Sequence, residues 1–253
     1  MILRRIGNKA KMAKEIQKYF PKHNLYIEPF FGAGGMFFNK PKAKYNILND
    51  LDSDVFNLFQ VVSLRKQELE ELFLQMPVSE DLSKHWGTTQ ETDPIRKALR
   101  FLFLSNYSFM GHMETLKFER NNTSKILHEN LKKTHEFLFG CQFMNADFRD
   151  IFKKIALRND AGKRDAFIYC DPPYLDTGNN YESGFTNKDS EDLFKALIES
   201  GCKFAMSEFN HPFIMEQAKD NGLIIETIGE RRNLDNRRIE ILVTNYKNNA
   251  TLF

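Results

Sequence analysis

Short apolar runs alternate along the chain with longer stretches in which apolar residues recur every three or four positions. A short run bounded by turn signals predicts a buried strand, and the longer spacing predicts a helix. The predicted strands occupy residues 25–28, 45–49, 142–147, 166–170, 203–207, 223–228 and 239–246. The predicted helices around them occupy residues 10–19, 54–65, 148–157, 190–200 and 212–220, with a polar turn at 159–164. This alternation predicts an α/β fold around a mostly parallel sheet.

One block interrupts the alternation and predicts a helical insertion at residues 59–139, within a discontinuous domain made of residues 1–58 and 140–253. Strands and helices alternate again only from residue 142. The parts of the block are a helical pattern mixed with a polar loop at 83–89 (residues 66–92), a strongly apolar helix (95–103), a polar segment with interleaved aromatics (105–122) and a further helix (124–139).

The last two predicted strands follow each other without a helix, which favours an antiparallel hairpin that closes one edge of the sheet. Arginines in such a connection can contact phosphates and position a nucleic acid without specifying its sequence. The alternative is a hairpin tip that is only solvated. The arginines of this connection are Arg231, Arg232, Arg237 and Arg238.

The composition excludes several classes of protein. The chain has 253 residues, 42% hydrophobic and 28% charged, which is enough for one large domain or two modest ones. A net charge of +2 does not indicate a nucleic-acid partner by itself. Three cysteines without a repeating spacing argue against a disulfide framework or a zinc site, and the six histidines show no metal-ligand spacing. Because neither a membrane-spanning run nor a signal-peptide core is present, we expect a soluble protein of a reducing compartment without a membrane partner.

A glycine-rich loop at residues 29–35 follows the first predicted strand. A strand, a glycine loop and a helix begin mononucleotide-binding units, and glycines let a ligand approach the backbone closely. The loop is not a G-x-G-x-x-G motif, so a tight turn without a ligand remains the alternative. The tip of the next strand carries Asp50, about where an acidic side chain binds ribose hydroxyls. The alternative is a helix cap, supplied by Asp50, Asp52, Ser53 or Asp54.

The strand at 166–170 runs directly into Asp171, Pro172, Pro173 and Tyr174. Open α/β sheets bind their ligands at the carboxyl ends of the strands. The prolines fix their φ angles and have no N–H, so this corner presents two acceptors, the Asp171 carboxylate and the Pro172 carbonyl oxygen. Tyr174 adds a flat face beside them. The combination suits an amino group on an aromatic ring, whereas Asp-Pro pairs also serve simply to begin turns.

A series of short motifs, in this order, resembles those of Dam-type DNA adenine N6-methyltransferases of the α order, in which the DNA-reading domain is inserted before the catalytic motif. The resemblance covers nearly the whole chain. The motifs are Gly7-Asn8-Lys9, Glu28-Pro29-Phe30-Phe31-Gly32-Ala33-Gly34-Gly35, Asn49-Asp50, Asn145-Ala146-Asp147-Phe148, Asp171-Pro172-Pro173-Tyr174, the aromatic residues Tyr181 and Phe185, and the closing strand Glu240-Ile241-Leu242-Val243-Thr244-Asn245-Tyr246.

The resemblance implies a Rossmann-like, seven-stranded class I methyltransferase sheet with a mostly α-helical inserted DNA-recognition domain. It also implies S-adenosyl-L-methionine as methyl donor and double-stranded DNA as substrate, in a bacterial or phage-encoded, cytoplasmic and nucleoid-associated protein. A cognate restriction endonuclease is a further implied partner, and the oligomeric state stays open. The implied cofactor-binding residues are Ile6, Gly7, Lys9, Glu28, Phe30, Gly32, Gly34, Gly35, Asp50, Asp147, Phe148 and Asp171.

The segment at residues 105–122 is where this resemblance places the reading of DNA, and it suggests a GATC-like target. His112 stands where related enzymes carry an arginine that reads guanine. Histidine cannot form the bidentate fork of arginine to guanine O6 and N7, so the target sequence stays open. Lys117, Arg120 and Lys125 are candidates for contacts with the DNA backbone, with a solvated surface as the alternative.

Adenine N6 chemistry gives the corner at residues 171–174 a specific hypothesis. Hydrogen bonds from the amino group to Asp171 and to the Pro172 carbonyl localise the nitrogen lone pair for in-line attack on a sulfonium methyl group. The target base must leave the duplex, which costs a few kcal/mol, and stacking on an aromatic ring returns ~1–3 kcal/mol. The predicted base-contacting residues are Pro173, Tyr174, Tyr181 and Phe185, with a place in the core as the alternative for each aromatic.

Other interpretations of the same residues stay open. A cytosine N4-methyltransferase uses the same exocyclic-amine chemistry, usually with serine in the first catalytic position, and a catalytically silent DNA-binding protein can keep the methyltransferase fold. A nicotinamide dehydrogenase shares the glycine loop but gives no role to residues 171–174. Methylation at cytosine C5 needs a cysteine nucleophile, typically after proline, and no cysteine of this chain follows a proline.

Overall fold

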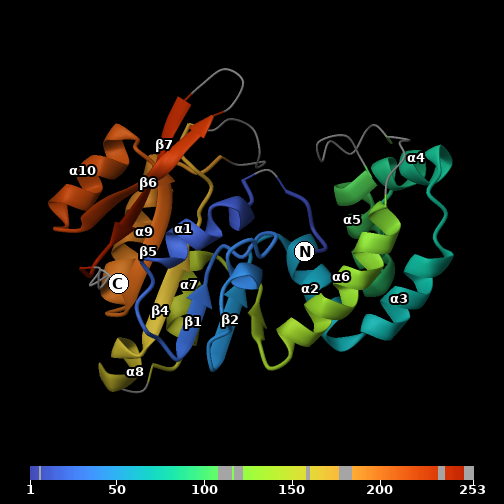
Figure 1. Cartoon of the computed structure of the whole chain (residues 1–253), viewed down its shortest axis with the longest axis horizontal. Coiled ribbons are helices and arrows are strands. Elements are labelled where there is room, and N and C mark those ends of the chain that lie inside the picture. Colours follow the sequence, from blue (N-terminus) through green and yellow to red (C-terminus); the bar gives the residue numbers. More distant parts are fainter. Residues whose placement is uncertain are drawn as a thin grey trace. The chain divides into compact units, whose positions relative to one another are not determined.

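The computed structural model describes residues 1–5, 7–107, 116, 122–157, 160–176, 184–232 and 237–247, without the side chains of Arg231, Arg232 and Arg237. Within these residues, seven strands form one mixed sheet in the order β3-β2-β1-β4-β5-β7-β6 (Figure 1). The strands are β1 (Leu25–Glu28), β2 (Tyr45–Asn49), β3 (Gln142–Met144), β4 (Ala166–Cys170), β5 (Lys203–Phe209), β6 (Ile224–Arg232) and β7 (Arg237–Thr244).

The sheet is parallel at its centre and antiparallel at one edge. β1 pairs in parallel with β2 and with β4, and β4 pairs in parallel with β5. β7 runs antiparallel to both β5 and β6. The predicted α/β fold, the seven-stranded Rossmann-like sheet and the antiparallel hairpin at its edge are confirmed.

The parallel register brings the ends of neighbouring strands to one edge of the sheet. Ile27 of β1 lies opposite Ile47 of β2 and Ile168 of β4, and Cys170 of β4 lies opposite Met206 of β5. β4 is buried along its whole length, as expected for a central strand covered on both faces. The carboxyl ends of β1, β4 and β5 therefore meet at the edge where α/β folds bind ligands.

Helices connect the strands and form the inserted block. The α-helices among the described residues are α1 (Ala13–Gln17), α2 (Ser53–Leu64), α3 (Lys66–Gln75), α4 (Glu80–Thr88), α5 (Pro94–Tyr107), α6 (Thr123–Leu138), α7 (Phe148–Lys154), α8 (Asp160–Arg164), α9 (Asn187–Glu199) and α10 (Pro212–Asp220). Short 3-10 helices occupy Lys9–Lys11 and Phe37–Asn39. Asp52 is the N-cap of α2, because its carboxylate accepts a hydrogen bond from the Asp54 amide at 2.9 Å.

The predicted polar loop at residues 83–89 is wrong for all but its last residue, because residues 83–88 belong to α4. Ser83 and Trp86 stand three residues apart, and both are buried on one face of this helix. Ser79 caps its start by accepting a hydrogen bond from the Leu82 amide at 3.2 Å. Buried contacts of one helix face therefore outweigh the polar composition of the segment.

Two boundaries near the resumed sheet also differ from the prediction. Residues 160–164 form the short helix α8 where a turn is predicted. β3 ends at Met144, so Asp147 does not lie at a strand tip. It is the N-cap of α7, and its carboxylate accepts a hydrogen bond from the Arg149 amide at 2.9 Å.

The chain forms two compact units. The first unit holds a group of helices, α2 to α6 (Figure 1). Inside this group the rings of Trp86 and Phe103 lie 5.2 Å apart, and the buried Arg100 donates through Nε to the Trp86 carbonyl oxygen at 2.7 Å. The first unit comprises Met1–Lys11, Gly32–Lys42 and Asp50–Asn145, and the second comprises Met12–Phe31, Ala43–Asn49 and Ala146–Phe253.

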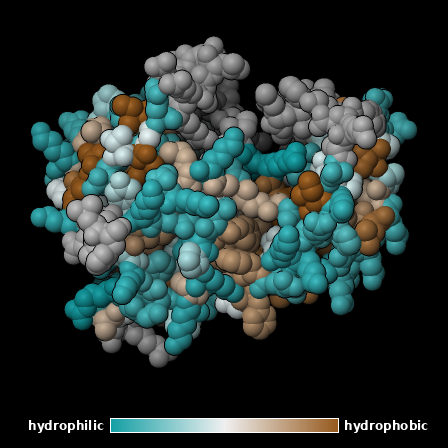
Figure 2. All heavy atoms as spheres, in the orientation of Figure 1, coloured by the Kyte–Doolittle hydropathy of each residue, from teal (hydrophilic) through white to brown (hydrophobic). Residues whose placement is uncertain are grey.

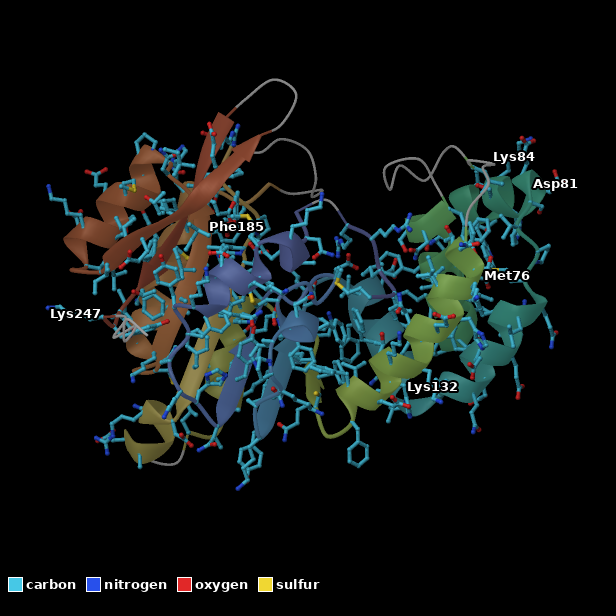
Figure 3. All side chains as sticks on the ribbon, viewed as in Figure 1. Met76, Asp81, Lys84, Lys132, Phe185 and Lys247 are labelled. Carbon is cyan, nitrogen blue, oxygen red and sulfur yellow. The ribbon has the colours of Figure 1, made fainter. Side chains whose placement is uncertain are left out.

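Hydrophilic residues are widespread over the described part of the face shown in Figure 2, with hydrophobic residues between them. On the helical group, Asp81 and Lys84 project outward from α4, and Lys132 projects outward from α6 (Figure 3). None of the described helices combines the length and the apolar character needed to cross a membrane.

Candidate active site

The Asp-Pro-Pro-Tyr corner begins where β4 ends. Cys170 is the last residue of β4, and Asp171 follows it directly. Pro172 and Tyr174 are buried, whereas Asp171 and Pro173 are half-buried. The Asp171 carboxylate therefore stands at the boundary between the core and the surface, where a ligand can reach it.

Tyr174 is held on two sides within the second unit. Its hydroxyl donates a hydrogen bond to Glu240 of β7, and its ring meets Phe209 of β5 edge-on, with centroids 4.7 Å apart. Burial raises the pKa of Tyr174 well above its usual value, and the charges of Asp171 and Glu240 add to the shift. The hydroxyl therefore stays protonated and acts as the donor. Stacking of this ring on a target base stays a prediction.

The chain just after Tyr174 is fixed by a second set of contacts. Asp176 has a φ angle of 55°, a left-handed conformation that costs a non-glycine residue roughly 1–2 kcal/mol. His211 accepts the Phe213 amide at Nδ1, so its Nε2 carries the hydrogen and donates to the Asp176 carboxylate at 3.0 Å. Arg238 donates to the Asp176 carbonyl oxygen at 3.3 Å. Arg238 thus supports the corner, and a contact of its side chain with phosphate stays a prediction.

Glu28 ends β1, the strand beside β4, and its side chain is buried. Its carboxylate accepts a hydrogen bond from the Tyr26 hydroxyl at 2.7 Å. Burial raises the pKa of the Cys170 thiol, and the charges of Glu28 and Asp171 add to this shift. Two carboxylates, the buried Glu28 and the half-buried Asp171, thus lie at the ends of the neighbouring strands β1 and β4.

Three predicted ligand-binding aromatics form one cluster in the second unit. Phe30 follows β1, Phe148 begins α7 and Phe185, labelled in Figure 3, precedes α9. The ring centroids lie 5.6 Å apart for Phe30 and Phe148, 6.2 Å for Phe30 and Phe185, and 6.1 Å for Phe148 and Phe185. These separations are those of favourable aromatic pairs. The structure thus brings Phe185, predicted for the target base, to the two rings predicted for the cofactor.

Asn49, the last residue of β2, joins three segments of the second unit. Its buried amide group donates to the carbonyl oxygens of Pro29 at 2.8 Å and Ala146 at 3.0 Å, and its Oδ1 accepts from the Ala146 amide at 3.1 Å. Its own carbonyl oxygen accepts from the Phe31 amide at 2.8 Å. Asn49 therefore fixes the start of the glycine loop against the residue that precedes Asp147.

In the first unit, the Asp50 carboxylate holds the glycine loop. It accepts hydrogen bonds from the amides of Gly32 at 2.5 Å and Asp52 at 2.9 Å. Burial raises the pKa of Asp50. The hydrogen bonds from Asp52 and Gly32 and the charge of Arg5 lower it, but the pKa remains raised overall. Gly32 has a φ angle of 52°, a left-handed conformation that suits glycine. Binding of ribose hydroxyls by Asp50 stays a prediction.

The amino-terminal motif packs against the end of the glycine loop, also in the first unit. A Cβ atom at Gly35 would lie 2.0 Å from Asn8 Oδ1 and 2.9 Å from the Lys9 amide nitrogen. No side chain fits at this position without displacing the motif. Lys9 is buried, and Gly7 and Gly34 have φ angles of 89° and 70°. The structure thus brings the predicted cofactor residues Lys9 and Gly35 together.

Several predicted residues lie outside the part of the chain that the structure describes, namely Ile6, His112, Lys117, Arg120 and Tyr181. The same holds for the side chains of Arg231, Arg232 and Arg237. Their roles stay predictions. Lys125 is described and exposed on α6.

The family model of D12 class N6 adenine-specific DNA methyltransferases matches residues 6–232 of this chain. The chain belongs to this family. As a D12 class enzyme, it transfers the methyl group of S-adenosyl-L-methionine to N6 of adenine in DNA, which confirms the predicted activity, cofactor and DNA substrate. Membership does not decide the target sequence.

Relatives of this D12 class methyltransferase include bacterial adenine methylases. The DNA adenine methylase of Salmonella typhi is 31% identical over 194 residues, which are 72% of this chain and 68% of the relative. The DNA adenine methylase of Escherichia coli strain K12 is 28% identical over 198 residues, again 72% of this chain and 68% of the relative. The type II methyltransferase M1.LlaDCHI of Lactococcus lactis subsp. cremoris is 26% identical and matches 96% of this chain and 94% of its own length.

Three residues of the site have no role assigned from the sequence, although Asn49 and Glu240 belong to the motifs quoted for the family resemblance. Glu240 is the one carboxylate of β7, and an acidic residue inside an apolar strand is the signal that could have found it. Asn49 is visible as a polar residue at the end of a buried strand. Arg149 gives no local signal, because Asp189 and Asp192, with which it pairs, are 40 and 43 residues away.

Proposed function

We propose that Asp171 and the carbonyl oxygen of Pro172 accept the two hydrogens of the adenine N6 amino group. The observation that carries this proposal is the position of Asp171, directly after the fully buried β4 and at the edge where β1 and β5 also end. The N6 lone pair is delocalised into the ring, and accepting both hydrogens concentrates it on nitrogen. Positive charge builds on this nitrogen as the methyl group arrives, so the Asp171 carboxylate stabilises the transition state more than the bound base.

Residues of the first unit and residues of the second unit are each assigned to cofactor binding. Each assignment rests on contacts inside its own unit. S-Adenosyl-L-methionine, when bound, supplies an electrophilic methyl group on a sulfonium sulfur. In the first unit, the Asp50 carboxylate beside Gly32 suits the hydroxyl donors of a ribose. In the second unit, the rings of Phe30 and Phe148 suit a flat adenine. The other assigned residues are Ile6, Gly7, Lys9, Glu28, Gly34, Gly35, Asp147 and Asp171.

Tyr174 is assigned to the target base, which has to leave the duplex before N6 can meet the methyl group. Its ring packs edge-on against Phe209 and its hydroxyl is held by Glu240, so the ring has a fixed orientation. Pro173 and Tyr181 are assigned to the same base. A preset ring lowers the entropy lost on base capture.

DNA recognition is assigned to residues 59–139, with double-stranded DNA as the substrate and a GATC-like target. His112 in place of a guanine-reading arginine favours a target that differs from GATC at the position it contacts. Backbone contacts are assigned to Lys125, which is exposed on α6, and to four arginines and one lysine outside the described side chains, namely Arg120, Arg231, Arg232, Arg237 and Lys117.

The names of the relatives support an inference about the biological setting. One relative, from Lactococcus lactis subsp. cremoris, is named a type II methyltransferase. This name supports a cognate restriction endonuclease as the functional partner, with the DNA of the nucleoid as the substrate that methylation protects.

The Asp171→Asn variant tests the catalytic assignment. It keeps the size of the side chain and removes its charge, so single-turnover methyl transfer at saturating S-adenosyl-L-methionine should fall by at least ~10²-fold. Saturation ensures that weaker cofactor binding does not cause the loss. Asp160→Asn, at the exposed start of α8, is the matched control and should transfer normally. Undiminished transfer by Asp171→Asn contradicts the assignment.

A further inference from the structure

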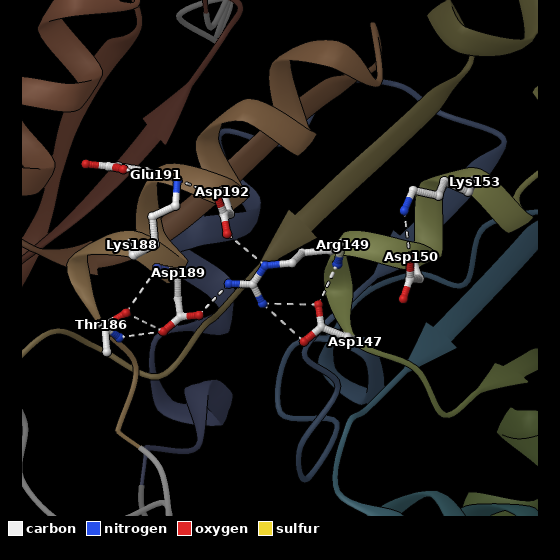
Figure 4. A network of polar contacts seen from close by, with 9 residues as sticks. All are labelled: Asp147, Arg149, Asp150, Lys153, Thr186, Lys188, Asp189, Glu191 and Asp192. Carbon is white, nitrogen blue, oxygen red and sulfur yellow. Dashed lines mark hydrogen bonds and ion pairs between the residues drawn. The ribbon is translucent and has the colours of Figure 1, made fainter.

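Arg149, the second residue of α7, contacts three carboxylates of the second unit (Figure 4). Its Nη1 lies 3.2 Å from Oδ2 of Asp147, its Nε donates to Oδ2 of Asp192 at 2.8 Å, and its Nη2 donates to Asp189. Lys188 approaches the same Asp192 carboxylate at 3.0 Å from the solvent side, where it is exposed. A planar guanidinium with five donors can serve three acceptors in this way, whereas an ammonium group cannot reproduce the fork.

These carboxylates lie at or near the starts of two helices that are distant in sequence. Asp147 is the N-cap of α7 and accepts from the Arg149 amide at 2.9 Å. Asp189 completes the capping box of α9, where it accepts from the Thr186 amide at 2.8 Å and from its hydroxyl at 2.6 Å. One side chain therefore ties the start of α7 to the start of α9.

Ring contacts join the same two segments. The Arg149 guanidinium carbon lies 4.4 Å from the centroid of the Phe148 ring, within the range of a cation–π contact. Phe148 in turn lies 6.1 Å from Phe185, the residue before Thr186. Phe185 and Thr186 lie directly before α9, so both kinds of contact link these two residues to the Asp147-Phe148 motif.

The contact between the starts of α7 and α9 depends on the positive charge of Arg149. Asp147, Asp189 and Asp192 converge on this guanidinium. Without it, like charges at the starts of α7 and α9 face one another and repel. The two segments would then move apart, and the Phe148 ring would lose its guanidinium neighbour.

We propose that Arg149 is a positioning residue that couples cofactor binding to the placement of Phe185 and Thr186, the two residues directly before α9. The proposal rests on the assignment of Asp147 and Phe148 to the cofactor. Arg149 acts through these neighbours and touches neither the methyl group nor the target nitrogen. Its loss should therefore weaken cofactor binding and lower kcat together, while leaving the KM for DNA nearly unchanged.

The test uses the full chain with Arg149→Gln and Arg149→Lys. Calorimetry should show S-adenosyl-L-methionine bound about tenfold more weakly by Arg149→Gln, equivalent to ~1.4 kcal/mol, with a KM for DNA within about twofold of wild type. Arg149→Lys should recover part of the affinity, because an ammonium group satisfies only some of the carboxylates. Combining Arg149→Gln with Asp189→Asn should change the affinity by less than the sum of the single effects.

Lys153→Gln is the matched control on the same helix. Lys153 forms an ion pair with Asp150, at 2.8 Å, and this pair is also drawn in Figure 4. Its removal should leave cofactor affinity and kcat at wild-type values. A general loss of stability in α7 would instead affect the Lys153 and Arg149 variants alike.

A folded Arg149→Gln protein with wild-type affinity for S-adenosyl-L-methionine and wild-type kcat overturns the proposal. If Arg149→Gln does not fold, Asp192→Asn replaces it, because this change weakens one of the three carboxylate contacts of Arg149, together with the Lys188 pair, and leaves the capping box of α9 intact. Unchanged cofactor affinity in Asp192→Asn then overturns the proposal. Failure of the wild-type protein to bind the cofactor or to methylate adenine contradicts the proposed function instead, so the two failures are distinguishable.

Discussion

The hydroxyl group of Tyr174 donates a hydrogen bond to the carboxylate of Glu240, and both side chains are buried. Tyr174 belongs to the corner after β4, and Glu240 lies in β7, two strands away across β5. The corner is therefore anchored by the sheet and not only by its prolines. The Tyr174 side chain therefore provides two things that can be removed separately, a hydroxyl donor for Glu240 and an aromatic ring.

Replacing the donor alone should affect stability more than chemistry. Tyr174→Phe keeps the ring against Phe209 but leaves Glu240 without this donor, so the free energy of unfolding should fall by roughly 1–3 kcal/mol in urea titrations. Tyr174→Ala also removes the ring and with it the stacking contribution of ~1–3 kcal/mol per base, so its methyl transfer should be slower by a further factor of about ten. Equal transfer rates for the two variants would show that the ring does not contact the target base.

A side chain at Gly35 should disrupt the amino-terminal motif. The Cβ atom of Gly35→Ala would meet Asn8 Oδ1 at 2.0 Å and the Lys9 amide nitrogen at 2.9 Å, and the second of these is backbone that cannot rotate away. We expect loss of measurable S-adenosyl-L-methionine binding by calorimetry. Gly184→Ala is the control, because none of the residues that the structure describes has an atom within 4 Å of a Cβ there. Asn8→Ala combined with Gly35→Ala should rescue binding only in part, and full rescue would contradict the role of the backbone contact.

The strand pattern carries most of what the sequence predicts about this site. Glu28, Asp50 and Asp171 are located by a buried apolar run that ends in polar residues. Such a run depends only on neighbouring positions, so both the strand and its end can be recognised in the sequence. Helix starts are less well marked. Asp147 is predicted at a strand tip and is instead a helix cap, since β3 stops three residues earlier, at Met144.

Contacts between distant segments are the part that the sequence does not predict. The partners of Arg149 are brought to it by the packing of α7 and α9. The contact between the rings of Phe185 and Phe30 likewise depends on tertiary packing, because the two residues are far apart in the sequence. Residues 83–88 show the converse, since burial of Trp86 makes a helix of a segment with polar composition.

Asn49 should contribute to both stability and cofactor affinity. Asn49→Ala removes side-chain hydrogen bonds to Pro29 and Ala146, of which the one to Pro29 is buried, so unfolding should become easier by roughly 1–3 kcal/mol. Cofactor affinity should fall with it, because the glycine loop loses its fixed start. The control Asn57→Ala removes one exposed hydrogen bond, to the Pro94 carbonyl oxygen, and should leave affinity unchanged. Wild-type affinity in Asn49→Ala would contradict this role.

The Arg149 cluster should make stability depend on pH in the acidic range. The hydrogen bond from Arg149, followed by that from Lys188, lowers the pKa of Asp192 below its usual 3.8. Because the folded value is lower than the unfolded one, this contribution to stability is complete above the usual value and is lost as the pH falls through the lowered value. Thermal unfolding of the wild-type protein and of Arg149→Gln, measured at several acidic pH values, gives the size of this contribution to stability. The acid-induced loss in Tm should be smaller in Arg149→Gln, and identical profiles would contradict the prediction.

Mass spectrometry of the nucleosides in duplex DNA, after incubation with S-adenosyl-L-methionine and either the wild-type protein or Asp171→Ala, tests the central claim most directly. N6-methyldeoxyadenosine should accumulate with the wild-type protein, without N4-methyldeoxycytidine. It should be absent with a folded Asp171→Ala protein, because the acceptor of the N6 hydrogen is gone. Methylated cytosine from the wild-type protein, or methylated adenine from Asp171→Ala, would contradict the account.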